Sequence, residues 1–354
     1  MIEPVNLNDY EQLARERLPG MVYDYYAGGA GDEMTLRENE RAWERLRLRP
    51  RVLVDVSGCD SRTTILGQSV SMPVMVGPCA LNALAHQDGE IAVARAATAT
   101  DVIQVVSTLS SYSLEEVAKA SAGKLWFQLY CYRDRAITRD LAERAEAAGF
   151  AAICVTVDVP VPGPRERDTR NRFRVPPNIR VANLAHLIED SSDGSALLKY
   201  IGNQFDPGLT WESLDWLHGV TRLPTVVKGV LTAEDARIAV DRGVAGIVVS
   251  NHGGRQLDGA VETCAALPEV AEAVVGKAEV FVDGGIRRGV DMLRAIALGA
   301  RAVLIGRPYL WGLAVDGEAG VRRVLALLHD ELHVCMALAG CVGLGDIGRS
   351  LLAS

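Results

Sequence analysis

The feature that most limits the fold of this 354-residue chain is a repeated alternation of two patterns. Short apolar runs rich in β-branched residues each end in small or polar residues and are followed by residues with helical spacing. This alternation is typical of a parallel sheet covered by helices, because parallel strands need a helical crossover to return to the same edge. The predicted strands are residues 73–78, 103–107, 125–130, 151–157, 224–228, 245–250, 279–283 and 301–306.

Eight such strands at this length predict a closed (β/α)8 barrel, the TIM-barrel fold of the α/β class. Helical spacing between the strands is clearest in residues 88–100, 133–148, 233–242 and 290–298. In these barrels the catalytic groups lie at the carboxyl ends of the strands, and phosphates bind near strands seven and eight. Candidate site residues are therefore sought where the apolar runs end.

Two segments fall outside the βα period. Residues 1–72 precede the first strand, and the helical spacing near their start predicts a helical extension packed outside the barrel. Residues 160–223 separate the fourth and fifth strands and combine several prolines with a polar run, which predicts a mobile lid over the barrel mouth. Since the sequence has no linker-like tract, we expect residues 1–354 to form a single domain.

Charge and composition exclude several classes of protein. The 37 basic and 45 acidic residues leave a net charge of −8, which argues against nucleic-acid binding and requires local cations for any anionic ligand. The seven cysteines are scattered without a C-x-x-C pair, so neither a zinc site nor disulfides are expected. The start does not resemble a signal peptide and no apolar run approaches a membrane span, which favours a cytoplasmic protein without membrane association.

The residues at the strand ends are unusually polar. Amide, hydroxyl and cationic groups around a barrel mouth can bind a flat, heteroatom-rich cofactor, because each donor can meet a ring carbonyl or nitrogen. These residues are Cys79 and Ala80, Ser107, Gln128 and Tyr130, Thr156 and Asp158, Lys228, Ser250 and His252, Asp283, and Gly306 and Arg307.

Strands seven and eight both end in glycine followed by arginine. The seventh ends in Asp283-Gly-Gly-Ile-Arg287, and the eighth ends in Gly306-Arg307. Glycine allows backbone N–H groups to approach an anion, and arginine binds it bidentately, so the two endings predict a phosphate site. For the Asp-Gly-Gly segment alone, the alternative is a tight turn.

The segment Ser250-Asn-His-Gly-Gly-Arg-Gln-Leu-Asp258 is too polar for a core. His252 is a candidate general base, because an imidazole titrates near neutral pH, and Arg255 can pair with a substrate carboxylate. Asp158 could stabilise the charged imidazole, although an aspartate after a strand is often a helix cap. Lys228 could form a Schiff base or could place a fixed positive charge beside a flavin ring, and the neighbouring polar residues favour the flavin.

These motifs resemble the FMN-dependent 2-hydroxy acid oxidase and dehydrogenase family. The resemblance implies an FMN cofactor, oxidation of an (S)-2-hydroxy acid to the 2-oxo acid, and a homotetramer. It runs essentially end to end, through residues 18–27, 126–130, 156–158, 227–229, 250–258, 283–287 and 306–307.

The resemblance also implies individual roles. His252 would take a proton from the substrate, with Asp158 and Tyr130 assisting. The implied substrate-binding residues are Tyr25, Leu109, Tyr130, Arg165 and Arg255. The implied cofactor-binding residues are Pro78, Cys79, Ala80, Ser107, Gln128, Thr156, Lys228, Ser250, Asp283, Gly284, Gly285, Arg287, Gly306 and Arg307.

Departures from the family bear on substrate and acceptor. Leu109 stands where glycolate oxidases carry tryptophan, and with Val161 it predicts apolar walls and a substrate larger than glycolate, such as lactate, a longer aliphatic acid or mandelate. Cys79 stands where several relatives have threonine. Ala80 resembles the oxidases, so O₂ is the expected acceptor and hydrogen peroxide the product. The alternatives are a dehydrogenase with another acceptor, an FMN barrel acting on a phosphorylated substrate, and a flavin-binding barrel without catalytic activity.

Overall fold

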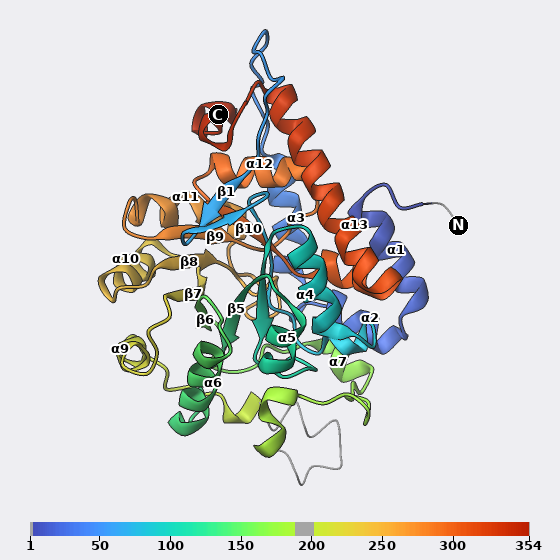
Figure 1. Ribbon diagram of the computed structural model, residues 1–354, viewed down its shortest axis with the longest axis vertical. Coiled ribbons are helices and arrows are strands. Elements are labelled where there is room, and N and C mark those ends of the chain that lie inside the picture. The colour runs from blue at the N-terminus through green and yellow to red at the C-terminus, as the bar shows by residue number, and fades with distance from the viewer. Residues whose placement is uncertain (1–2, 188–201, 354) are drawn as a thin grey trace.

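The centre of the protein is a closed barrel of parallel strands, seen in a computed structural model that describes residues 3–187 and 202–353 (Figure 1). The order β10-β3-β4-β5-β6-β7-β8-β9 confirms the predicted (β/α)8 barrel, and each predicted strand overlaps an observed one. The barrel strands are β3 (Val74–Val76), β4 (Ile103–Ser107), β5 (Lys124–Leu129), β6 (Ile153–Thr156), β7 (Thr225–Val230), β8 (Gly246–Val249), β9 (Glu279–Val282) and β10 (Ala302–Ile305).

The barrel closes where β10 pairs with β3, with Val303 opposite Val74 and Leu304 opposite Met75. Alternate side chains point into the barrel, where Trp126 and Phe281 meet edge-on with ring centroids 5.7 Å apart. The other side chains of the same strands pack against the surrounding helices. The continuous apolar runs of the sequence thus reflect strands that are buried on both faces.

A short antiparallel hairpin fills the amino-terminal end of the barrel. Its strands are β1 (Thr63–Ile65) and β2 (Gln68–Val70). Ile65 and Val70 are only 0% and 2% exposed and join the apolar cluster inside the barrel. The extension of residues 1–72 therefore contains a hairpin as well as helices. The hairpin was not predicted from the sequence, because each strand has only three residues and contributes one apolar side chain to the core.

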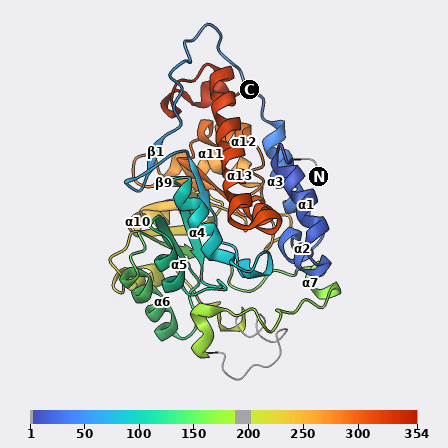
Figure 2. The same ribbon diagram turned by 45° about the vertical axis from the view of Figure 1, so that its right-hand side comes forward.

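Helices surround the barrel, as Figures 1 and 2 show from two directions. Four of them coincide within two residues of the segments predicted from helical spacing: α4 (Gly89–Ala99), α6 (Arg135–Ala147), α10 (Ala233–Asp241) and α12 (Gly289–Ala297). Other covering helices include α5 (Leu114–Ala120), α11 (Thr263–Ala273) and α13 (Arg307–Ala339). Helix α13 is kinked at Asp316 and Gly317.

Before the hairpin, the chain forms α1 (Leu7–Arg17), α2 (Gly20–Ala27) and α3 (Met34–Arg45). Helix α1 packs along α13 on the outside of the barrel, whereas the carboxyl end of α2 reaches the barrel mouth (Figures 1 and 2). None of the helices in the described ranges is long and apolar enough to cross a membrane.

The segment predicted as a lid contains α7 (Glu166–Arg170), a 3₁₀ turn (Ala182–Leu187) and α9 (Glu212–His218), while residues 188–201 of that prediction lie outside the described residues. Helix α9 differs from the prediction. Leu217 is buried, and the Trp216 ring lies 4.7 Å from the guanidinium carbon of Arg135 on α6. Residues 212–218 therefore belong to the outer helical layer of the barrel.

Candidate active site

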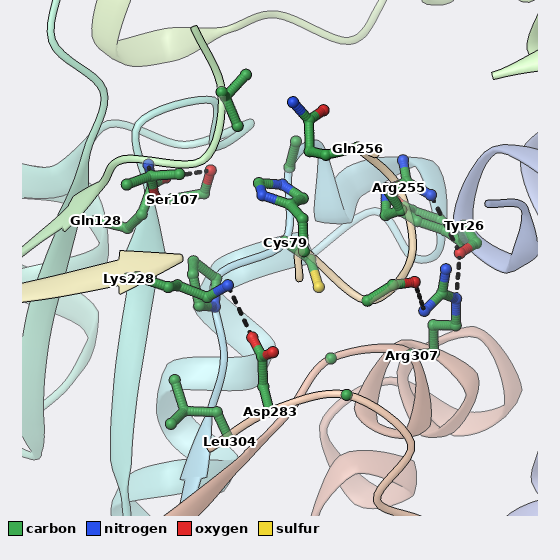
Figure 3. Close-up of a pocket in the computed structure, with 18 of the residues that line it drawn as sticks. Tyr26, Cys79, Ser107, Gln128, Lys228, Arg255, Gln256, Asp283, Leu304 and Arg307 are labelled. Carbon is green, nitrogen blue, oxygen red and sulfur yellow. Dashed lines mark hydrogen bonds and ion pairs between the residues drawn. The ribbon is translucent and has the colours of Figure 1, made fainter. Parts of the chain in front are cut away.

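A cavity opens at the carboxyl ends of the barrel strands, where the sequence analysis placed the site (Figure 3). It brings together most of the predicted site residues. Those that line it are Tyr25, Pro78, Cys79, Ala80, Ser107, Leu109, Gln128, Tyr130, Thr156, Arg165, Lys228, His252, Arg255, Asp283, Gly284, Gly285, Arg287, Gly306 and Arg307. The other two, Asp158 and Ser250, lie behind this wall and contact residues in it.

His252 is held by Asp158. The His252 Nδ1 atom and the Asp158 Oδ1 atom lie 3.0 Å apart, which leaves Nε2 as the ring nitrogen available to a ligand. Burial acts to raise the pKa of Asp158, but His252 and then Lys228 outweigh it and hold that pKa below its usual value. Asp158 is therefore an anion beside the imidazole, and it stabilises the ring when the ring gains a proton.

The backbone at His252 is in the left-handed region, with φ of 59°, and the next two residues, Gly253 and Gly254, have φ of 63° and 73°. Such a value is uncommon for a residue with a side chain. The Ser250 hydroxyl holds the turn by accepting the His252 backbone N–H at 3.1 Å. Glycines at the next two positions let the chain turn sharply after β8 and direct the imidazole into the cavity.

Lys228 is a buried cation. Its Nζ atom donates to the Ser250 hydroxyl at 2.7 Å. The same atom lies 2.7 Å from the Asp283 carboxylate, as Figure 3 shows. Burial acts to lower the pKa of Lys228, but the carboxylates of Asp283 and Asp158 raise it above its ordinary value. A protonated amine is not a nucleophile, so the structure disfavours the Schiff-base alternative and supports a fixed positive charge at this point.

A chain of amide and hydroxyl groups joins the neighbouring strands β4, β5 and β6. Gln128 accepts a hydrogen bond from the Ser107 hydroxyl at 3.2 Å and donates from Nε2 to the Thr156 hydroxyl at 2.9 Å. All three side chains are buried, and each lines the cavity. These contacts fix the direction of the Gln128 amide and present polar groups to a ligand along one wall.

Two arginines connect the cavity to the carboxyl end of α2. Arg255 donates to the carbonyl oxygens of Tyr25 and Gly28 at 2.8 and 2.9 Å. Arg307 donates to those of Tyr26, Gly28 and Gly253 at 2.9, 2.9 and 3.1 Å, and Figure 3 shows the bond to Tyr26. Guanidinium groups satisfy the unpaired carbonyls at a helix end, so both residues hold the extension on the barrel as well as facing the cavity.

The same arginines create a concentration of positive charge. Burial, followed by repulsion from Arg255 and Arg287, lowers the pKa of Arg307 to about 9. An anion beside these groups would relieve the repulsion. Arg287 donates to the Glu40 carboxylate at 2.6 Å, and this pair lies at the edge of the same cluster.

The glycine turn after β9 fits closely against α3. Gly284 and Gly285 have φ of 88° and 81°, and a Cβ atom on Gly285 would lie 2.2 Å from the Asn39 carbonyl oxygen. The Trp43 indole N–H donates to the Gly284 carbonyl at 2.8 Å. Only glycine fits at position 285, and Gly284 and Gly285 both line the cavity together with Asp283.

Arginines and aromatic rings also line the cavity. The guanidinium carbons of Arg165 and Arg255 lie 5.3 and 5.4 Å from the centroid of the Tyr25 ring, which stacks on Phe173 at 4.4 Å. Tyr130 stacks on Phe205 at 4.4 Å, and burial raises the pKa of the Tyr130 hydroxyl, so it remains protonated. This part of the cavity suits a small molecule with a carboxylate and a hydroxyl group.

The predicted apolar wall needs a correction. Leu109 lines the cavity as expected, but Val161 is 61% exposed, and its neighbours Val159 and Pro162 line the cavity instead. The loop after β6 has no regular structure at these positions, so sequence alone does not show which side chains turn inward. Phe205, from the region predicted as a lid, adds another apolar group that was not predicted from the sequence.

Tyr26 and Gln256 are among the other cavity residues that were not predicted. Tyr26 follows Tyr25 and donates from its hydroxyl to the Leu81 carbonyl at 2.6 Å. Gln256 follows Arg255 and makes hydrogen bonds to the loop after β6. Each stands next to a predicted residue, within residues 18–27 or 250–258. These two motifs therefore indicated where the residues lie but not what they contact. In the described part of the chain, no cluster of histidine, cysteine, aspartate or glutamate could hold a metal ion.

Comparison with known proteins identifies the family. Residues 14–354 match the FMN-dependent dehydrogenase family. The chain belongs to this family. It is 54% identical to an L-lactate oxidase of Nostoc sp., covering 99% of this chain and 98% of that one. It is 49% identical to a glycolate oxidase of Spinacia oleracea, covering 100% of this chain and 96% of that one.

The fold agrees with solved structures of another relative. Mandelate oxidase with (S)-4-hydroxymandelic acid superposes with a TM-score of 0.94 at 47% identity, covering 99% of this chain and 98% of that chain. The family assignment confirms the resemblance found in the sequence and the expectation of FMN as cofactor.

The cavity of this family member fits FMN. Among the described residues, Asp283 Oδ1 is buried without a hydrogen-bond partner, which leaves an acceptor for a ligand. The cation cluster around Arg307 is suited to a phosphate, and Gly284 and Gly285 of the turn after β9 line the same cavity. The Gln128 and Lys228 side of the cavity presents donors suited to a heteroatom-rich ring.

Proposed function

We propose that this enzyme oxidises (S)-2-hydroxy acids larger than glycolate to 2-oxo acids, with O₂ as electron acceptor and hydrogen peroxide as product. The activity itself is the FMN-dependent oxidation of a 2-hydroxy acid, shared by relatives named L-lactate oxidase, glycolate oxidase and mandelate oxidase. The observation that carries the proposal is that His252, held by Asp158, lines one cavity with Arg165 and Arg255.

FMN, when bound, supplies a two-electron acceptor for the electrons that leave the substrate carbon. Gln128, Thr156 and Lys228 would hold its ring, and Arg287 and Arg307 would hold its phosphate. The fixed charge of Lys228 favours negative charge in its neighbourhood, because a buried ammonium acts at short range in a medium of low dielectric constant.

His252 takes the substrate proton. Its Nδ1 is occupied by Asp158, so Nε2 is the atom that accepts the proton. The carboxylate of Asp158 then faces an imidazolium, and this attraction stabilises the state in which the proton has been removed. Tyr130, protonated and stacked on Phe205, is placed to donate a hydrogen bond to the substrate oxygen.

Arg165 and Arg255 recognise the carboxylate. Both guanidinium groups lie against the Tyr25 ring, at 5.3 and 5.4 Å, so they converge on one region of the cavity. Arg255 already donates from Nη1 to backbone carbonyls, and its other N–H groups remain for a ligand. A carboxylate bound here would be held by charge-assisted hydrogen bonds, which are stronger than neutral ones.

The size of the substrate depends on the apolar side of the cavity. Leu109, Val159 and Pro162 line this side and leave more room than an indole at position 109 would. Each additional buried methylene group contributes about 0.8 kcal/mol, so preference should rise with side-chain length until the pocket is full.

Anaerobic mixing of the FMN enzyme with a panel of (S)-2-hydroxy acids tests the proposal. Glycolate, L-lactate, (S)-2-hydroxyhexanoate and (S)-mandelate should each remove the visible flavin absorbance, with higher kcat/KM for the larger acids. Admission of air should restore the absorbance and form hydrogen peroxide in equal amount. A preference for glycolate would refute the proposed substrate size. Slow reoxidation in air would refute O₂ as the acceptor and would indicate a dehydrogenase that uses another acceptor.

We also infer a homotetramer in the cytoplasm, as the family resemblance and the sequence suggest. Light scattering during gel filtration tests the first of these, and fractionation of cells that express the natural gene tests the second. A monomer in solution, or recovery with the membrane fraction, would refute the respective inference.

A further inference from the structure

Gln256 forms three hydrogen bonds with the main chain of a single loop. Its Nε2 atom donates to the carbonyl oxygens of Asp158 and Val161, both at 2.9 Å, and its Oε1 atom accepts the Gly163 N–H at 3.0 Å. Figure 3 shows Gln256 at the cavity beside Arg255. One amide side chain thus contacts this loop at three points along residues 158–163.

The loop cannot hold its own shape through regular hydrogen bonding. Pro160, Pro162 and Pro164 alternate with other residues, and proline has no N–H to donate. A side chain that donates twice and accepts once therefore replaces the missing main-chain partners. Gly163 lies so close to the neighbouring loop that a Cβ atom there would be 2.2 Å from the Arg255 carbonyl oxygen.

The two ends of the loop carry different parts of the site. Asp158 stands at its start and supports His252. Arg165 stands at its end, where its guanidinium lies 5.3 Å from the Tyr25 ring and its Nε atom 3.2 Å from the Asp168 carboxylate. The path of the loop between these residues sets the distance from the proton acceptor to the carboxylate-binding arginine.

We propose that Gln256 is a positioning residue that places Arg165 relative to His252 by fixing the loop of residues 158–165. It acts through the loop and need not contact the substrate. The inference rests on the proposed function, because it assumes that Arg165 binds the carboxylate of a 2-hydroxy acid. Loss of the amide should weaken carboxylate binding more than it affects FMN binding.

The test is a double-mutant cycle on the FMN enzyme with Gln256→Met, Arg165→Met and both together. Methionine keeps the length and volume of glutamine but cannot make these hydrogen bonds. The readouts are the Kd of oxalate, an unreactive dicarboxylate, from the visible flavin spectrum, and the KM and kcat for L-lactate. Leu257→Ala is the matched control, since the adjacent Leu257 side chain is 75% exposed.

Gln256→Met should raise the Kd of oxalate and the KM for lactate by about tenfold to a hundredfold, the scale expected for a displacement near 1 Å. The Kd of FMN and the Tm of the enzyme should stay close to the wild-type values. In the Arg165→Met background, the same substitution should change the Kd of oxalate by less than about threefold, because the group that it positions has been removed.

Two outcomes separate the inference from the proposed function. If the wild-type enzyme neither binds oxalate nor oxidises any 2-hydroxy acid, the proposed function fails. If the wild type binds oxalate and Gln256→Met binds it equally well, the positioning role fails. The role also fails if the Gln256→Met substitution weakens oxalate binding by the same factor in the wild type and in Arg165→Met. If Gln256→Met does not retain FMN, Gln256→Asn takes its place in the cycle, because the shorter amide cannot reach all three partners. The same loss of oxalate affinity is expected, and unchanged affinity would again refute the positioning role.

Discussion

Single residues in this enzyme act through pairs of buried charges. His252 depends on Asp158 for its orientation, and Lys228 depends on Asp283 for its charge. In both pairs the carboxylate is largely buried, so removal of one partner would leave an unpaired charge in the protein interior. Substitutions that keep the shape of the side chain are therefore the informative ones.

His252→Gln should keep FMN bound and lose the proton acceptor. The rate at which a 2-hydroxy acid removes the flavin absorbance should fall by about 10² to 10⁴-fold, the usual contribution of a general base. Stopped-flow spectroscopy without oxygen measures this rate directly. Near-native rates in this variant would sink the assignment of His252 as the base.

Leu109→Trp should narrow the apolar side of the cavity. Because Leu109 lines this wall, the larger indole would take space that a long substrate side chain needs. The ratio of kcat/KM for mandelate to that for glycolate should fall by about tenfold or more, which corresponds to the burial of one or two methylene groups. An unchanged ranking of substrates would show that another residue determines pocket size.

At the scale of elements, the loops after β3 and β4 meet over helix α4. Glu90 on this helix is buried, and its Oε1 atom accepts the backbone N–H groups of Asn82 and Ser111 at 2.9 and 3.0 Å. Its Oε2 atom has no partner among the described residues, and burial raises the pKa of Glu90 from 4.5 to about 7. Below about pH 7 the folded protein therefore holds Glu90 mostly in its protonated form.

Glu90→Gln should change how stability depends on pH. Between about pH 4.5 and 7 the folded protein binds a proton that the unfolded chain releases, so the wild type loses stability as pH rises, by at most about 1.4 kcal/mol per pH unit. Glutamine does not titrate, so its stability has no such pH dependence. The free energy of unfolding of Glu90→Gln should therefore rise relative to that of the wild type between pH 5 and pH 8. Urea unfolding of both proteins at pH 5 and pH 8 measures the two free energies. If the variant and the wild type differ by the same amount at both pH values, Glu90 is not a buried carboxyl that titrates in this range.

The contact between α3 and the turn after β9 gives another prediction. Gly285→Ala would bring a Cβ atom against the Asn39 carbonyl, whereas Gly259 has a similar φ of 84° and open space around it. Relative to Gly259→Ala, we expect Gly285→Ala to lose about 1–3 kcal/mol of unfolding free energy through overpacking. Titration with FMN should also show weaker binding. Equal stability and FMN affinity in the two variants would argue against a tight fit at this turn.

At the scale of the whole molecule, the helical extension, the barrel and the cofactor site form one connected structure. The hairpin fills one end of the barrel, and at the other end Arg255 and Arg307 bind the carbonyls of α2. These arginines repel each other when no anion is present, so the cofactor phosphate should stabilise the entire fold.

Removal of FMN should therefore lower the Tm of the protein. Addition of FMN at a hundred times its Kd should raise the free energy of unfolding of the apoprotein by about 2.7 kcal/mol. Riboflavin, which lacks the phosphate, should restore less at the same ratio of ring to protein, because it leaves the cation cluster around Arg307 unneutralised. Differential scanning calorimetry of the apoprotein with each flavin provides the measurement. Equal stabilisation by riboflavin would place the main anchor at the ring.

The sequence alone was enough to predict the barrel and to place the site at the carboxyl ends of its strands. Strand and helix periods are local, so the eight apolar runs and their polar ends are readable one segment at a time. Closure of the barrel then brings Gln128, Lys228 and His252 to one mouth, because all parallel strands end on the same side.

Only the tertiary structure decided which polar atoms meet. Arg307 and the α2 carbonyls lie 279 to 281 positions apart in the chain, and no local pattern relates them. The same holds for the hairpin inside the barrel and for the inward turn of Val159 in place of Val161. Such contacts depend on how whole elements pack and on where irregular loops run, and these follow from the sum of many long-range contacts.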